Sequence, residues 1–171
     1  CQDIEYICGF NLDRRAYAAW DCITVAPGAI SAVRRSAIKA AGGFSRDTLA
    51  EDTDLTLAIH RTGMRVEYQP QAIAYTEAPE TLKGLIQQRF RWAYGTLQCV
   101  FKHADMLFNP RFGALGWFSL PGILFFQFLL VAVAPLIDLY FIRAILMGHG
   151  ADVLPYVAAF LVCDLVLAFV A

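Results

Sequence analysis

The stretch Gln88-Arg89-Phe90-Arg91-Trp92 decides how this sequence is interpreted. It lies in a run after Pro79 whose apolar residues recur at intervals of three and four, which predicts a helix. On a helix, Gln88, Arg91 and Trp92 share one face. A guanidinium binds phosphate through a planar fork, an amide adds hydrogen bonds, and an indole offers a flat apolar surface. This face suits a ligand with a diphosphate and a sugar ring, although a helix with a solvated arginine and a tryptophan at its core edge has the same pattern.

A second helix is predicted upstream, with acidic residues at its start. The run Thr48-Leu49-Ala50-Glu51 matches a capping box, so we expect a helix from here to about Thr62, stopped by Gly63. Asp52 follows directly, and a carboxylate directed toward an apolar face is costly unless it serves a function. Glu51 beside it either shares that function or caps its own helix.

The run Asp52-Thr53-Asp54 has the spelling of a divalent-metal motif. Side chains at i and i+2 of a helix point about 200° apart, so these two carboxylates are not expected to converge on one ion. We expect Asp54 to point away from the core with Arg61. No metal ligand is therefore assigned within this sequence.

Short β-branched or alternating runs predict strands beside turns. The turn Pro27-Gly28 separates two of them and is followed by Arg34 and Arg35, which are either functional or the solvated end of an ordinary hairpin. A short helix over Ala37–Ala41 should stop at Gly42-Gly43. The predicted strands are Cys22–Ala26, Ala29–Val33, Arg65–Tyr68 and Ala72–Thr76.

The last third of the sequence is strongly apolar. Phe118–Ile137 contains no charged residue and is long enough to span the hydrocarbon core of a membrane. Val153–Ala171 predicts a second span. Asp138 and Asp164 either line a polar path or pair with a partner such as Arg143.

Charge is distributed unevenly along the 171 residues. The net charge is −1, but thirteen of the fourteen Lys and Arg residues lie at or before Arg111 and only Arg143 follows it. No basic run indicates nucleic-acid binding. The five cysteines are scattered without C-x-x-C pairs, which favours free thiols in a reducing compartment.

A paired carboxylate, then Q-x-x-R-W, then membrane spans, in this order, resembles the processive family 2 glycosyltransferases. These are the synthases of cellulose, chitin, hyaluronan and poly-N-acetylglucosamine. The resemblance implies an α/β fold of the glycosyltransferase-A (nucleotide-diphospho-sugar transferase) type. It also implies the C-terminal part of a cytoplasmic catalytic domain over residues 1–108, an interfacial segment over 109–117, and transmembrane helices over 118–147 and 153–171, the second one truncated.

The resemblance also implies roles for individual residues. Asp52 would be the general base, with Glu51 as its catalytic neighbour. Two further sets would bind the substrates: Gln88, Arg89 and Arg91 the donor diphosphate, and Trp92, Gly28 and Arg34 the acceptor. A divalent metal, Mg or Mn, would be held mainly by residues upstream of this sequence.

The implied activity is that of a membrane-bound, inverting, processive hexosyltransferase. It would add a sugar, for which N-acetylglucosamine is the best choice, from a UDP-sugar donor to a growing β-linked exopolysaccharide of the biofilm type. The bilayer and export subunits would be its partners. Positive charges at Lys102 and Arg111, beside the first span, predict a multi-pass protein of the inner (plasma) membrane with its catalytic part in the cytoplasm. The alternatives are a non-processive enzyme that loads a lipid carrier and a non-catalytic membrane scaffold.

Overall fold

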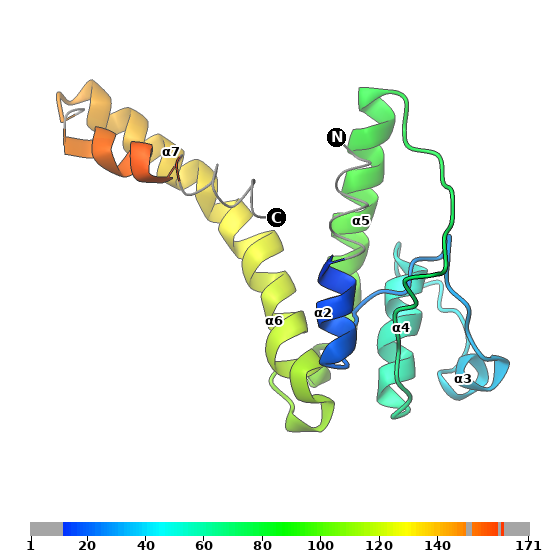
Figure 1. Cartoon of the computed structure of the whole chain (residues 1–171). Coiled ribbons are helices and arrows are strands. Elements are labelled where there is room, and N and C mark those ends of the chain that lie inside the picture. Colours follow the sequence, from blue (N-terminus) through cyan, green and yellow to red (C-terminus); the bar gives the residue numbers. More distant parts are fainter. Residues whose placement is uncertain (1–11, 150–151, 161, 163–171) are drawn as a thin grey trace. The chain divides into compact units, whose positions relative to one another are not determined.

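The computed structural model describes residues 12–149, 152–160 and 162 (Figure 1). It divides into two compact units, one ending at Leu124 and the other beginning at Phe125. The predicted functional residues all belong to the first unit. Each unit is described by itself below.

Four α-helices organise the described part of the first unit before its apolar end. They are α2 (Arg14–Ala19), α3 (Arg35–Ala40), α4 (Glu51–Arg61) and α5 (Leu82–Lys102), followed by the short 3-10 helices η2 (Ala104–Met106) and η3 (Pro110–Phe112). Helices in the regions of α3, α4 and α5 were expected from sequence. The α3 helix begins two residues earlier than predicted and ends at glycines with positive φ, Gly42 and Gly43.

The start of α4 differs from the capping-box prediction. Its N-cap is Ala50, which has no capping side chain, so the box centred on Thr48 is wrong. Three carboxylates in the first turn take its place, because negative charge is favoured near the amino end of a helix dipole. The other end agrees with the prediction: Thr62 is the C-cap, and Gly63 follows with a φ of +80°.

The α5 helix carries the Q-x-x-R-W stretch. Its N-cap Thr81 accepts a hydrogen bond from Gly84 N at 3.1 Å, and the helix ends at Lys102. The apolar residues at the start of α5 are not buried: Leu82 and Ile86 are 73% and 60% exposed. The fully buried residues of α5 lie in its second half, at Gly95, Cys99 and Val100.

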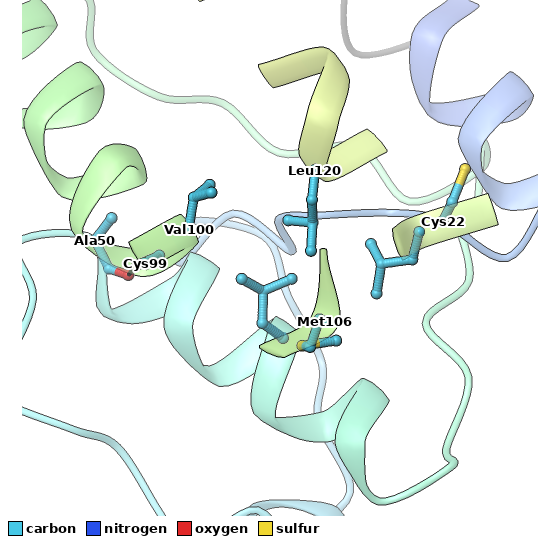
Figure 2. Close-up of a cluster of buried hydrophobic side chains, with 8 residues drawn as sticks. Cys22, Ala50, Cys99, Val100, Met106 and Leu120 are labelled. Carbon is cyan, nitrogen blue, oxygen red and sulfur yellow. Dashed lines mark hydrogen bonds between the residues drawn. The ribbon is translucent and has the colours of Figure 1, made fainter. Parts of the chain in front are cut away.

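The helix α4 is buried on two sides. Leu57 belongs to the larger apolar cluster, together with Cys22, Ala50, Cys99, Val100, Met106, Leu115 and Leu120 (Figure 2). Leu55 and Ile59 belong to a second cluster with Ala37 of α3. Because α4 packs on both sides, its ends are held firmly relative to α3 and α5.

No residue in the described ranges is assigned to a strand, so the four strand predictions are wrong for this structure. An extended segment becomes a strand only when it pairs with a neighbouring backbone, and the described residues provide none for these runs. Residues 64–80 form an extended connection from α4 to α5, in which Tyr75 is 98% exposed. A turn inside it is closed by the hydrogen bond from Ala72 N to Gln69 O at 3.1 Å.

An apolar helix runs from Leu115 to Leu146 and is long and apolar enough to cross a membrane. Its segments alternate between π-helical and α-helical geometry: η4 (Leu115–Ser119), α6 (Leu120–Gly122), η5 (Ile123–Leu129) and α7 (Leu130–Leu146). Pro121 and Pro135 lie inside it, and proline removes a backbone donor from the helical ladder. Residues 152–160 are also helical, but most of the predicted second span, with Asp164, lies outside the described residues.

Candidate active site

The first turn of α4 docks on α5 at a glycine. A methyl group added to Gly95 would lie 2.8 Å from both the Cβ and the N of Ala50, so only glycine permits this approach. Leu49 N donates to Gln98 Oε1 at 3.0 Å, and the Cys99 thiol donates to Ala50 O at 3.4 Å.

This contact lies near both sets of residues that sequence predicted for the site. Asp52 lies two residues after Ala50, in the first turn of α4. Trp92 lies one turn before Gly95, about 4.5 Å along the α5 axis. Asp52 on α4 and Trp92 on α5 therefore each lie within one helical turn of the contact between Ala50 and Gly95.

The Asp52 carboxylate faces the Pro27-Gly28 turn. Its Oδ2 accepts a hydrogen bond from Gly28 N at 3.2 Å, and its Oδ1 accepts one from Thr53 N at 2.7 Å. Asp52 is half-buried, and a Cβ at Gly28 would meet nothing within 4 Å. A carboxylate oriented by two backbone amides therefore lies beside open space.

The segment before this turn is bonded to two helices. Ala26 N donates to Thr56 Oγ1 at 3.0 Å, and Thr56 Oγ1 donates to Asp52 O at 2.7 Å. Arg14 of α2 donates to Val25 O. Burial lowers the pKa of Arg14, whereas the charge of Asp52 acts to raise it.

Sequence reasoning missed Arg14 and Thr56. Arg14 and Arg15 are adjacent in sequence, but only Arg15 is exposed and Arg14 is half-buried. The bonds that reveal their roles join residues 11 and 30 positions apart, so no local pattern marks them.

On α5 the two arginines have different environments. The Arg89 guanidinium lies 5.2 Å from the Trp92 ring centroid, within the range of a cation–π contact, so it supports the indole. Arg91 is exposed, and Gln88 and Trp92 are half-buried. Arg91 is therefore the guanidinium of this face that solvent reaches most openly.

The remaining predicted residues lie at the surface. Glu51 is exposed at the start of α4, and Arg34 is exposed at the N-cap of α3. Neither side chain forms a cap bond. Their proposed roles toward the reaction and the acceptor stay predictions.

Asp54 corrects the expectation that it points outward. It is 3% exposed, and its Oδ2 accepts from Lys102 Nζ at 2.8 Å while its Oδ1 accepts from His103 Nε2 at 2.7 Å. Burial acts to raise the pKa of Asp54, but the hydrogen bonds from Lys102 and His103 outweigh it and lower that pKa. The outward prediction failed because the end of α5 covers this side of α4.

The carboxylates of Asp52 and Asp54 therefore serve different partners and do not converge. Within the described residues, no group of three or more His, Cys, Asp and Glu side chains could hold a metal ion. The residues present do not fit a metal site, and we assign no metal ligand to them.

Two histidines are structural in this unit. His60 Nε2 bonds to Ile23 O at 2.9 Å, and His103 bonds to Asp54. Burial lowers the pKa of His60 against the opposing effect of the Ile23 carbonyl. Burial also lowers the pKa of His103, and the bond to Asp54 opposes that shift only in part.

The described residues thus include an oriented carboxylate on α4 and a guanidinium–indole face on α5. The chain matches the Glycosyl transferase family group 2 over residues 9–171, and it belongs to this family. Membership implies the glycosyltransferase-A-type nucleotide-sugar transferase fold. The helical part described here is consistent with a portion of that fold.

Two curated relatives illustrate the similarity. The chain is 30% identical over 164 residues to the probable glycosyltransferase YdaM of Bacillus subtilis strain 168, covering 93% of this chain and 39% of the relative. It is 32% identical over 94 residues to the poly-beta-1,6-N-acetyl-D-glucosamine synthase of Staphylococcus aureus strain COL, covering 55% of this chain and 23% of that protein. The chain thus spans well under half the length of these relatives. No solved structure gives a significant match.

Proposed function

We propose that this chain is part of a membrane-bound, processive, inverting glycosyltransferase that extends a β-linked polysaccharide. The observation that carries the proposal is the contact between Gly95 and Ala50, which joins the oriented carboxylate of Asp52 to the helix face with Arg91 and Trp92. Family membership supports sugar transfer from a nucleotide donor to a saccharide acceptor.

The chemistry follows from the charges of these side chains. Asp52 takes the proton of the acceptor hydroxyl, whose oxygen attacks the anomeric carbon of the donor sugar. The bond from that carbon to the diphosphate breaks on the opposite side, so the configuration inverts and UDP leaves. Arg91 stabilises the negative charge that develops on the leaving diphosphate.

The acceptor side of the site is formed by Trp92 and the Pro27-Gly28 turn. An indole face stacks well on the apolar face of a sugar ring, and Arg89 holds this indole by its cation–π contact. The open space at Gly28 admits a sugar close to the backbone beside Asp52. In this proposal Gln88 and Arg34 complete the donor and acceptor contacts.

N-acetylglucosamine is the proposed sugar, and the inner membrane is the proposed location. The similarity to a poly-beta-1,6-N-acetyl-D-glucosamine synthase supports this choice of donor. The apolar helix Leu115–Leu146 supports membrane attachment, and the positive charges of Lys102 and Arg111 on its amino-terminal side support a cytoplasmic active site. A divalent metal, export subunits and a second span remain part of the proposal, with metal ligands outside the described residues.

The test uses the full-length protein in membranes. Radiolabelled UDP-N-acetylglucosamine, UDP-glucose and UDP-glucuronate are supplied in turn, and the product is sized on a gel. Asp52→Asn removes the base and should lower the rate by about a hundredfold or more. Asp105→Asn, at an exposed carboxylate paired with Arg61, is the matched control and should act like wild type.

The product distinguishes the alternatives. A long polymer that depends on Asp52 supports the proposal. A single sugar on a lipid carrier points to a non-processive enzyme. Equal incorporation by wild type and Asp52→Asn contradicts the role of Asp52, and no incorporation from any donor favours a scaffold.

A further inference from the structure

One buried hydroxyl connects the base to the turn in front of it. Thr56 lies one helical turn after Asp52 on α4 and is 2% exposed. Its Oγ1 accepts from Ala26 N at 3.0 Å and donates to Asp52 O at 2.7 Å. Because the hydroxyl uses its single donor and an acceptor position in these two bonds, its orientation is determined.

A second helix fixes the same segment from another direction. Arg14 of α2 donates to Val25 O, the carbonyl directly before Ala26 N in the chain. The charge of Asp52 also attracts the Arg14 guanidinium. Two consecutive residues of the segment are thus bonded to two different helices, α2 and α4.

The turn itself begins at the next residue. Ile30 N donates to Pro27 O at 3.0 Å and closes the turn, while Gly28 N is directed to Asp52 Oδ2 at 3.2 Å. The position of the Gly28 amide depends on the backbone that precedes it. That backbone is attached to α4 through Thr56.

We propose that Thr56 is a positioning residue of the transferase site, which orients the Asp52 carboxylate by holding the Pro27-Gly28 turn against the first turn of α4. The inference rests on the proposed role of Asp52 as the base. Arg14 of α2 contributes to the same positioning through its hydrogen bond to Val25 O. A carboxylate released from the Gly28 amide would sample orientations unsuited to the acceptor hydroxyl, and small misplacements slow a reaction strongly.

The expected kinetic effect is specific. The bonds of Thr56 reach only the turn and α4, whereas the proposed diphosphate contacts lie on α5. Loss of the hydroxyl should therefore lower kcat for polymer formation and leave the KM for the donor nearly unchanged. A substitution that only weakened packing would instead lower the amount of folded protein and leave the kcat of each folded molecule unchanged.

The experiment compares substitutions that separate the hydroxyl from the volume of the side chain. Thr56→Val keeps the shape and removes both bonds, and Thr56→Ser keeps the hydroxyl and removes a methyl group. Thr62→Val is the matched control, because Thr62 at the C-cap of α4 makes the same type of bond, to Ile59 O at 2.7 Å, far from Asp52. Each full-length protein is assayed in membranes with varied UDP-N-acetylglucosamine, after its amount and thermal unfolding are measured.

Thr56→Val should lower kcat by about tenfold or more with a donor KM within about twofold of wild type. Thr56→Ser and Thr62→Val should retain most of the activity. The inference is overturned if Thr56→Val is fully active, if Ser is as damaging as Val, or if only the donor KM changes. If Thr56→Val does not accumulate, Arg14→Met is compared with Arg15→Met, and equal activities overturn the inference.

Wild type and Asp52→Asn are measured in the same series, so that two failures can be told apart. Incorporation that does not depend on Asp52 overturns the proposed function and this inference with it. Asp52-dependent incorporation together with a fully active Thr56→Val overturns the inference alone.

Discussion

A single hydrogen atom at position 95 decides how closely α4 approaches α5. Any larger side chain would place its Cβ atom 2.8 Å from the Ala50 backbone nitrogen, which is too close. Glycine inside a helix lowers helix stability by roughly 1 kcal/mol relative to alanine. That cost is offset here by the close contact of α5 with the residue that precedes the first turn of α4.

We expect Gly95→Ala to destabilise the first unit by about 1–3 kcal/mol, because the added methyl group forces the two helices apart. Activity should fall as well, since the base moves away from Trp92. Thermal unfolding and polymer synthesis of the full-length protein measure the two effects.

The control for this prediction is Gly122→Ala in α6, where a Cβ would meet nothing within 4 Å. It should be neutral or slightly stabilising. Similar destabilisation by both substitutions would mean that the contact with Ala50 is not the cause.

At the same scale, Asp52 and Asp54 show what sequence can and cannot predict. Helical geometry correctly separates their side chains, because that separation depends only on local dihedral angles. The burial of Asp54 could not be predicted, since its partners Lys102 and His103 are 48 and 49 residues away. A charged side chain in an otherwise polar first turn gives no local sign of such a pairing.

At the scale of elements, the joint between α4 and α5 combines apolar packing with a buried polar network. Lys102 Nζ bonds to Asp54 and also reaches Ser45 Oγ at 2.8 Å. The bond to Asp54 raises the pKa of Lys102, despite the opposing effect of burial. The end of α5 is therefore attached both to α4 and to the loop that precedes it.

Two buried or half-buried histidines, His103 at this joint and His60 against the Ile23 carbonyl, make the first unit sensitive to acid. The pKa values of His60 and His103 are lowered in the folded chain, whereas the unfolded imidazoles titrate near about 6.5. The unfolded state thus binds more protons as pH falls below that value. Stability should be fully present above about pH 6.5 and decline at lower pH, by at most about 1.4 kcal/mol per pH unit for each histidine.

Tryptophan emission during thermal unfolding, recorded from pH 7.5 to pH 5, measures this decline. A double variant, His60→Gln with His103→Gln, should have a lower midpoint at pH 7 but a flatter pH dependence. Asp54 does not contribute to a change between pH 7.5 and pH 5. Its pKa is lowered in the folded chain, so the stability that it provides is lost only below the ordinary carboxyl pKa of about 3.9. An unchanged slope in the double variant would contradict the assignment to these two histidines.

At the scale of the whole molecule, the helix Leu115–Leu146 is the feature that bears on membrane attachment. Only 6% of its most apolar window is buried within the described structure. Soluble proteins rarely expose an apolar surface of this extent, so a bilayer is the environment that suits it. Asp138 is exposed in the middle of α7.

A charge placed in the middle of this helix should prevent insertion. Val131→Arg is expected to cost about 3 kcal/mol of apparent insertion free energy. Leu146→Arg, at the last residue of the helix, should cost much less because its side chain can reach the interface. Resistance to alkaline extraction from membranes measures both, and equal behaviour of the two variants would argue against a span centred here.

Sequence alone determined the helices that carry the site, the family and the apolar helix. Helix ends, a Q-x-x-R-W face and a long uncharged segment are local features, set by propensity and spacing within a few turns. Tertiary structure decided which of these features meet. The contact of Gly28 with Asp52, the bonds of Thr56 and Arg14, and the absence of paired strands among the described residues all depend on backbone distant in sequence. Such contacts form only when helices pack, because packing supplies the partners that buried polar groups require.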